Sequence, residues 1–183
     1  MVAHMFSLAI LALALYEGNL KAVAQNEAPR LQTGDLLPIL AGQSLSGEPI
    51  ELPPTAEGHP SVALFSFSRA GGQRAQEWIQ HLSREMPDMR IYSAIFLEAV
   101  PRPFRGVVVS EIKSRTPQEE QGRTILLYAK SNAWKQQLQT CDVEDVCVLL
   151  LGPDSHIRWM TGGAFSTNSD QALRAKLRSL GHE

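Results

Sequence analysis

The sequence has little cysteine, little net charge and no long apolar segment. Only two of its 183 residues are cysteines, and 17 lysines and arginines nearly balance 19 aspartates and glutamates, so the formal net charge is −2. Because no basic run stands out, electrostatic binding of nucleic acid is excluded as a main function. The cysteines lie six positions apart, unlike the close pairs of a zinc site, and the five histidines show no ligand spacing. The sequence therefore indicates no metal and no cofactor.

What remains is an ordinary composition for one folded domain, with 44% hydrophobic and 20% charged residues. A chain of this length buries roughly 70% of its unfolded surface, so it needs neither a metal nor a disulfide in order to fold. We expect a single domain over residues 34–183, preceded by a polar and flexible lead-in over residues 25–33.

The N-terminus has the pattern of a secretory signal. The segment Phe6–Leu15 is apolar except for Ser7, and it is too short to cross a bilayer as a helix. Small residues at Ala22 and Ala24 precede Gln25 and match the pattern of a cleavage site. We therefore predict that residues 1–24 are a signal peptide. The protein is expected to be exported, either periplasmic or associated with the membrane by an uncleaved N-terminal segment.

The most informative stretch joins a buried strand to an amphipathic helix. Residues 62–67 are rich in valine and phenylalanine and predict a core strand. The segment that follows has apolar residues with the i, i+3, i+4, i+7 spacing of a helix face, at Ala75, Trp78, Ile79 and Leu82. A tight turn containing two glycines separates the strand from this helix.

The other apolar runs predict further strands and helices. We expect strands at 36–40 and 49–53, paired as an edge hairpin, and at 90–96, 124–129, 146–151 and 156–160. Between the strands at 90–96 and 124–129, we expect a helix because Phe104, Val107, Val108 and Ile112 suit one helical face, although residues 107–109 alone would suit a strand. Ser131 is a candidate N-cap for a short helix over 132–138. The final helix is expected to begin with a capping box of Asn168 and Gln171 and to bury Leu173, Leu177 and Leu180.

This order of elements resembles the thioredoxin-like superfamily, in its peroxiredoxin and TlpA-like branch. A βαβ unit is followed by a helix, a β-hairpin and a terminal helix. The local motifs that carry the resemblance are Gly34-x-x-x-Pro38, Ser46-Gly47, the strand–turn–helix over 65–78, and residues 150–157. The resemblance implies an α/β fold, with a central mixed β-sheet flanked by helices and an N-terminal β-hairpin extension.

Within that superfamily, one family is more similar. The chain resembles the mitochondrial chaperones for assembly of the ATP synthase membrane sector, which are thioredoxin-like and lack the active-site cysteines. Two motifs carry this resemblance: Ser68-Arg69-x-Gly71 followed by Trp78, and Ile157-Arg158-Trp159-x-x-Gly162. It implies binding of a newly inserted membrane subunit rather than catalysis.

The resemblance also shows what the chain has lost. Redox members of the superfamily carry Cys-x-x-Cys at the helix N-terminus, where the helix dipole favours the thiolate. Here those four positions are Ala70, Gly71, Gly72 and Gln73. The superfamily's cis-proline position falls on Val146, where we expect a trans bond because a non-proline cis bond costs about 2.5–4 kcal/mol. Conventional thioredoxin activity is therefore not expected.

The two cysteines, Cys141 and Cys147, allow three interpretations. They flank an acidic segment just before the predicted central strand. An even count in an exported protein favours a disulfide, and closing so short a loop would stabilise the fold by about 2 kcal/mol. The alternatives are two buried free thiols, or a relocated redox or metal-binding pair, which the acidic neighbours disfavour because they oppose formation of the thiolate.

Four more residues are candidates for binding. Arg69 and Arg74 lie near the predicted helix N-terminus, which could hold an anion, although the glycines there could simply satisfy a tight turn. Arg158 and Trp159 belong to the outer hairpin strand, and both residue types are favoured in interfaces. In a regular strand Ile157 and Trp159 share one face, with Arg158 on the other. The alternative to an interface role for Trp159 is therefore burial in the core.

The leading hypothesis is a non-catalytic binding or assembly factor whose partner is another protein, with a membrane-protein subunit as one candidate. The first alternative is a relative of thiol-disulfide oxidoreductases or peroxidases that works through Cys141 and Cys147. The second alternative is binding of an anion or small molecule near Gly72.

Overall fold

A computed structural model describes residues 29–54, 58–139, 141 and 145–181. The predicted signal peptide, residues 1–24, lies outside the described residues. The described end of the predicted lead-in is anchored to the domain, because Leu31 is buried and its N–H donates to the carbonyl of Gln137 at 2.8 Å.

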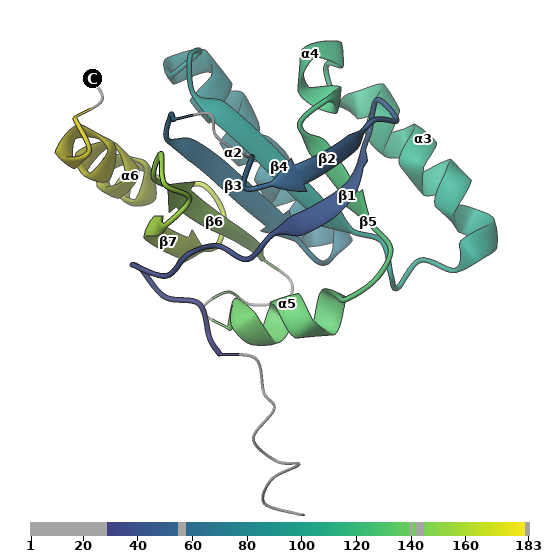
Figure 1. Ribbon diagram of the computed structural model, residues 1–183. Helices are drawn as coiled ribbons and strands as arrows, with labels where there is room; N and C mark the ends of the chain where they lie inside the picture. The colour runs from purple at the N-terminus through teal and green to yellow at the C-terminus, as the bar shows by residue number, and fades with distance from the viewer. Residues whose placement is uncertain (1–28, 55–57, 140, 142–144, 182–183) are drawn as a thin grey trace, which may run out of the picture.

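The protein is built on a seven-stranded mixed sheet with the strand order β2-β1-β5-β4-β3-β6-β7 (Figure 1). The strands are β1 Leu40–Ser44, β2 Pro49–Leu52, β3 Ser61–Ser66, β4 Arg90–Phe96, β5 Thr124–Leu127, β6 Val146–Leu151 and β7 Ile157–Gly162. β3, β4 and β5 are parallel to one another, and the remaining neighbours pair antiparallel. The predicted α/β fold, with a β1–β2 hairpin at the sheet edge, is confirmed.

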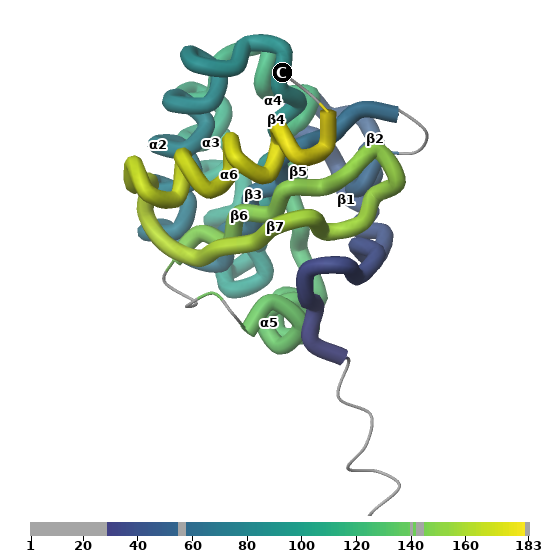
Figure 2. The backbone as a smooth tube through the Cα atoms, turned by 90° about the vertical axis from the view of Figure 1, so that its left-hand side faces the viewer, coloured from purple at the N-terminus to yellow at the C-terminus, as the bar shows by residue number. Residues whose placement is uncertain are grey.

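Helices cover both faces of this sheet. They are α2 Arg69–Glu85, the 3-10 turn η1 Arg102–Phe104, α3 Arg105–Arg115, α4 Gln118–Gln121, α5 Ser131–Gln137 and α6 Thr167–Ser179. α2 and α3 lie on the same side of the sheet (Figure 2). Leu173 of α6 packs in the same buried cluster as Trp78 of α2, and Trp134 of α5 belongs to a separate cluster on the opposite face.

Side-chain alternation along the central strands builds the two cores. On β3 and β6, Leu64 and Leu150 point toward α2 and α6, whereas Phe65 and Leu149 point toward α5. All four side chains are fully buried, as expected for central strands that are covered on both faces.

The first strand lies later in the chain than its apolar pattern predicts. β1 begins at Leu40, and in the preceding segment Leu37 is buried while Leu36 and Ile39 are exposed. A Cβ atom at Gly42 would lie 2.5 Å from Ile125 Cγ2 of β5, so β1 approaches its neighbour closely through a residue without a side chain. This packing requirement, rather than local hydrophobicity, fixes the position of the strand.

Two helix starts also differ from the predictions. α5 begins at Ser131 itself, so Ser131 is not its N-cap, and the carboxylate of Glu98 accepts the Ser131 N–H at 2.8 Å. In α6 the capping box is formed by Ser166 and Ser169 rather than by Asn168 and Gln171. Serine is among the favoured N-cap residues, and the box begins here two residues earlier than we predicted.

The helix expected between β4 and β5 is confirmed as α3. The face that it turns toward the sheet differs from the predicted one. Val108, Val109 and Ile112 pack against the buried cluster of Leu45, Leu97 and Leu126. Phe104 and Val107 lie on the outside and expose 60% and 69% of their surface.

Replacing Glu98 by Gln is expected to destabilise the protein at neutral pH but not in acid. The hydroxyl and the N–H of Ser131 both donate to the Glu98 carboxylate and lower the pKa of Glu98. A carboxyl group with a lowered folded pKa stabilises the fold above its unfolded pKa, and this contribution is lost as the pH falls through the folded value. Urea unfolding of both proteins at about pH 7 and about pH 3 measures the difference. An equal difference at both pH values would contradict the expectation.

Candidate functional site

The four positions at which the resemblance predicts Cys-x-x-Cys, residues 70–73, form the first turn of α2. Ser68 is the N-cap, and its Oγ accepts the N–H of Gly71 at 3.0 Å. The N–H of Gly72 donates to the Ser68 carbonyl at 3.0 Å. Residues 70–73 carry no side chain that can act as a nucleophile at neutral pH, so this end of α2 supplies no thiol chemistry.

The backbone just before β6 lies directly against this turn. A Cβ atom at Gly71 would lie 2.7 Å from the carbonyl oxygen of Asp145. Asp145 precedes Val146, so the structure brings together the two regions in which the redox apparatus was expected. The single cis peptide bond among the described residues is Leu52–Pro53, so the bond before Val146 is trans.

The two candidate arginines at this end of α2 both have carboxylate partners. Arg74 forms an ion pair with Asp145, and Arg69 Nη2 lies 3.3 Å from Glu111 Oε1 of α3. Because the N–H groups of Gly71 and Gly72 are bonded to Ser68, this arrangement does not favour an open anion site. Sequence reasoning missed Asp145, although an acidic residue next to the expected cis-proline position was a usable signal.

Of the three interpretations of the cysteines, the structure shows the disulfide Cys141–Cys147, with the Cα atoms 5.4 Å apart. Cys147 lies opposite Phe65 in the β3–β6 ladder and packs with Trp134 in the core beside α5. The preceding residue, Val146, packs on the α2 side. The disulfide therefore lies on the opposite face of the sheet from α2.

Reducing this disulfide is expected to lower the free energy of unfolding by about 2 kcal/mol, because the unfolded chain then gains conformational freedom. In a chain of this size the midpoint of thermal unfolding should fall by about 4–8 °C. Calorimetry with and without dithiothreitol measures the shift. The matched control is Cys141→Ala, which should unfold at the lower temperature and should not respond to the reductant. A wild-type midpoint that does not move would contradict the expectation.

Arg158 and Trp159 lie where β7 departs from regular pairing. Trp159 is opposite Leu150 but Ile157 is opposite Leu151, so the register shifts between them. Such a bulge inserts an extra residue and reverses the facing of the side chains beyond it. Ile157 thus packs on the α5 side and Trp159 on the α2 side, and the prediction that they share a face is wrong. Arg158 pairs with Asp154.

The sequence did not reveal an exposed apolar surface on and beside α3. We define the α3 surface as Phe104, Val107 and Tyr128, all exposed. The first two are three residues apart and therefore neighbours on one helical face. The guanidinium of Arg105 lies 5.0 Å from the centre of the Tyr128 ring and connects α3 to the segment after β5. The spacing predicts that Phe104 and Val107 share the apolar face of Val108 and Ile112, so their exposure is a structural finding.

Neither a metal site nor a membrane span is found in the part of the chain that the structure describes. Its histidines, cysteines, aspartates and glutamates form no group of three or more that could hold a metal ion. Its helices are also too short or too polar to cross a membrane.

No family model matches the chain, and no curated protein matches it. Solved structures do. The putative thiol:disulfide interchange protein DsbE from Chlorobium tepidum is similar with a TM-score of 0.57 and 13% identity, over 82% of this chain and 98% of that one. BsSco, from the Sco family of cytochrome c oxidase assembly proteins, is similar with a TM-score of 0.54 and 13% identity, over 87% of this chain and 99% of that one. The peroxiredoxin-like protein from Aquifex aeolicus is similar with a TM-score of 0.54 and 9% identity, over 83% of this chain and 90% of that one.

These similarities establish the fold. The protein has a thioredoxin-like fold that carries an N-terminal β1–β2 hairpin. At such low identity, the chemistry of those proteins does not transfer to this chain.

Proposed function

We propose that this is a non-catalytic thioredoxin-like protein that binds another protein and assists its assembly, with a membrane-protein subunit as the expected class of partner. The observation that carries the proposal is the α3 surface. Large apolar side chains that gather on the outside of a folded domain are typical of sites where another protein docks.

The composition of the α3 surface resembles that of protein–protein interfaces and supports the proposal. Aromatic and arginine side chains are enriched at the centres of protein–protein contacts, and here Phe104 and Tyr128 are accompanied by Arg105. Two of the apolar side chains expose well over half of their surface, so their burial against a partner would contribute favourable free energy at roughly 25 cal/mol per Å².

The α2 N-terminus supports a binding role over a thiol reaction. It has no cysteine, its first turn packs against the Asp145 backbone, and Arg69 connects it to Glu111 of α3. The α3 surface and the N-terminus of α2 are therefore joined by a contact between neighbouring helices. A partner that covers α3 would reach Arg69.

The comparisons and the sequence motifs support an assembly role. One similar structure belongs to a family of cytochrome c oxidase assembly proteins. The motifs around Arg69 and Trp159 resemble chaperones for the ATP synthase membrane sector, and the N-terminal pattern predicts export. Together they favour a partner at or in a membrane.

Site-specific photocrosslinking tests the proposal. A photoreactive phenylalanine at Val107 is expected to capture a membrane protein in cells, and the crosslink should be lost when Phe104 is also changed to Glu. The matched control is Ile39, which is 70% exposed against 69% for Val107 but lies before β1. Equal capture from both positions, or none from Val107, would contradict the proposal.

A second candidate function is thiol-disulfide exchange through Cys141–Cys147. The observation that favours it is the position of Cys141, which is only half-buried and therefore partly accessible to a thiol. If this function holds, the protein reduces insulin disulfides in the presence of dithiothreitol, and the turnover disappears in Cys141→Ala.

A further inference from the structure

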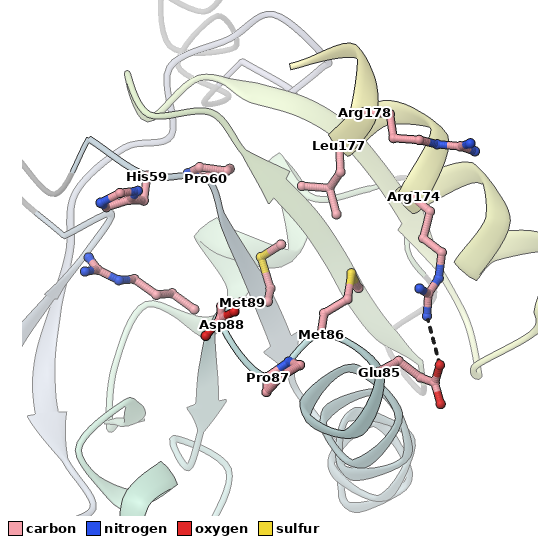
Figure 3. A pocket seen from close by; sticks show the side chains of 11 residues that line it. His59, Pro60, Glu85, Met86, Pro87, Asp88, Met89, Arg174, Leu177 and Arg178 are labelled. Atoms are coloured by element: carbon pink, nitrogen blue, oxygen red, sulfur yellow. Dashed lines mark ion pairs between the residues drawn. The ribbon is translucent and has the colours of Figure 1, made fainter. Parts of the chain in front are cut away.

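A pocket of about 820 Å³ opens beyond the C-terminal end of α2, beside α6 (Figure 3). It is lined by residues from three segments, 59–60, 85–90 and 174–178. Because α2 has 17 residues, its length of about 25 Å separates this pocket from the Ala70–Gln73 turn. The α2–α6 pocket is therefore distinct from the site described above.

The floor of the pocket is apolar and adaptable. Met86, Met89 and Leu177 project between the two helices in Figure 3. Both methionines are half-buried and pack against the α2–α6 core. Methionine side chains are flexible and polarisable, so they accommodate apolar chains of varied shape.

The rim of the pocket is basic, although the whole chain carries a net charge of −2. Three arginines, Arg90, Arg174 and Arg178, line it against two carboxylates, Glu85 and Asp88. Arg174 is already paired with Asp170 and Glu85, so Arg178 is the residue at this rim that favours an anion over a cation.

One of these arginines is held in place by other side chains. Arg174 Nε donates to Asp170 Oδ2 at 2.9 Å, and Arg174 Nη2 lies 3.8 Å from Glu85 Oε2. Arg178 follows one helical turn later on α6 and is exposed. Its spacing of four residues places it one turn along the same side of the helix as Arg174, and in Figure 3 its side chain extends outward at the edge of the pocket.

We propose that the α2–α6 pocket binds a single-chain amphiphile with an anionic carboxylate head, of the class of medium-chain fatty acids. The apolar chain lies on Met86, Met89 and Leu177, and the carboxylate pairs with Arg178 at the rim. The volume falls within the roughly 300–1,000 Å³ of small-molecule sites. This inference does not depend on the proposed function, because the α3 surface contributes no residue to the pocket.

Calorimetric titration with decanoate tests the inference, with decanol and decyltrimethylammonium as probes of equal chain length and different head charge. Decanoate and decyltrimethylammonium are used below their micelle-forming concentrations, and decanol is used below its solubility in water. We expect saturable binding of decanoate and binding at least about tenfold weaker for the other two. Decanol or the cation binding as tightly as decanoate, or no binding of decanoate, would overturn the proposal.

Variants locate the site. Arg178→Glu is expected to weaken decanoate binding about tenfold, and Met89→Trp should block it by filling the floor. Arg84→Glu is the matched control, since Arg84 is an exposed arginine in the last turn of α2 that does not line the pocket. Circular dichroism verifies that each variant is folded. Decanoate binding that Arg178→Glu leaves unchanged, or that Arg84→Glu weakens equally, would overturn the assignment.

Membrane lipids also combine apolar chains with anionic head groups. A second experiment therefore separates binding of a free amphiphile from binding to a lipid bilayer. The protein is sedimented with vesicles of phosphatidylcholine and phosphatidylglycerol. We expect it to stay in the supernatant while it binds decanoate in solution. Sedimentation with vesicles without binding of decanoate would overturn the proposal of a free amphiphile.

Discussion

Replacing Gly71 by Ala is expected to destabilise the protein by about 2–3 kcal/mol. The new Cβ atom would lie 2.7 Å from the carbonyl oxygen of Asp145 and 3.2 Å from its carbonyl carbon. Because both are backbone atoms, relief requires α2 or the segment before β6 to move, and that movement also disturbs the ion pair between Arg74 and Asp145. Urea unfolding measures the loss of free energy.

Gly72 supplies the matched control for this variant. It is the next residue in the same helical turn, and a Cβ atom there would meet no heavy atom within 4 Å. Gly72→Ala is therefore expected to be neutral or to stabilise the helix by up to about 1 kcal/mol. If the two alanine variants have equal stability, the close contact between α2 and Asp145 does not exist in solution.

Replacing Trp78 by Ala is expected to lower the free energy of unfolding by about 3–5 kcal/mol. Trp78 is fully buried between α2 and α6. Its Nε1 donates to the Gly163 carbonyl at 3.1 Å, and its ring meets Phe165 edge-on with the centroids 5.2 Å apart. The substitution leaves a large cavity and also leaves the Gly163 carbonyl without this donor.

Two further variants separate the contributions of Trp78. Trp78→Phe keeps most of the volume but loses the N–H donor, so its cost should be well below that of Trp78→Ala. Trp159→Ala removes a tryptophan that is only half-buried in the same core, and it should also cost less. A larger loss for Trp159→Ala than for Trp78→Ala in thermal unfolding would contradict the packing of this core.

The sequence was sufficient to predict an element where its local pattern agrees with the packing of that element in the fold. The predicted strands over 62–67 and 146–151 are β3 and β6, because a strand buried on both faces reads as a continuous apolar run. The spacing of Trp78, Ile79 and Leu82 identified α2, since a single apolar stripe permits one orientation of the helix. These elements define the thioredoxin-like arrangement.

The sequence was not sufficient to predict the bounds or the facing of an element where these depend on packing between segments that are distant in the chain. β1 is positioned by the approach of Gly42 to β5, and Glu98 accepts the first N–H of α5 from a different part of the chain. The bulge in β7 reverses the facing of Trp159. In α3 a run of three valines fits two helical faces equally, and only contact with Leu45 and its neighbours selects one.

The candidate site was likewise predictable only in the features that depend on local sequence. The absence of cysteine from residues 70–73 could be read directly, whereas the contact of Gly71 with Asp145 joins residues far apart in the chain. The exposure of Val107 and the pocket between α2 and α6 leave no local signal, because each depends on which residues lie opposite in space.

The measurement that tests the central claim most directly is the yield of the photocrosslink from position 107 in three backgrounds. The account predicts that Cys141→Ala, which cannot form the disulfide, captures the membrane protein as well as the parent does at a temperature where both are folded. It also predicts that Phe104→Glu loses the capture. If Cys141→Ala loses the crosslink and Phe104→Glu keeps it, the function depends on thiol chemistry rather than on the α3 surface.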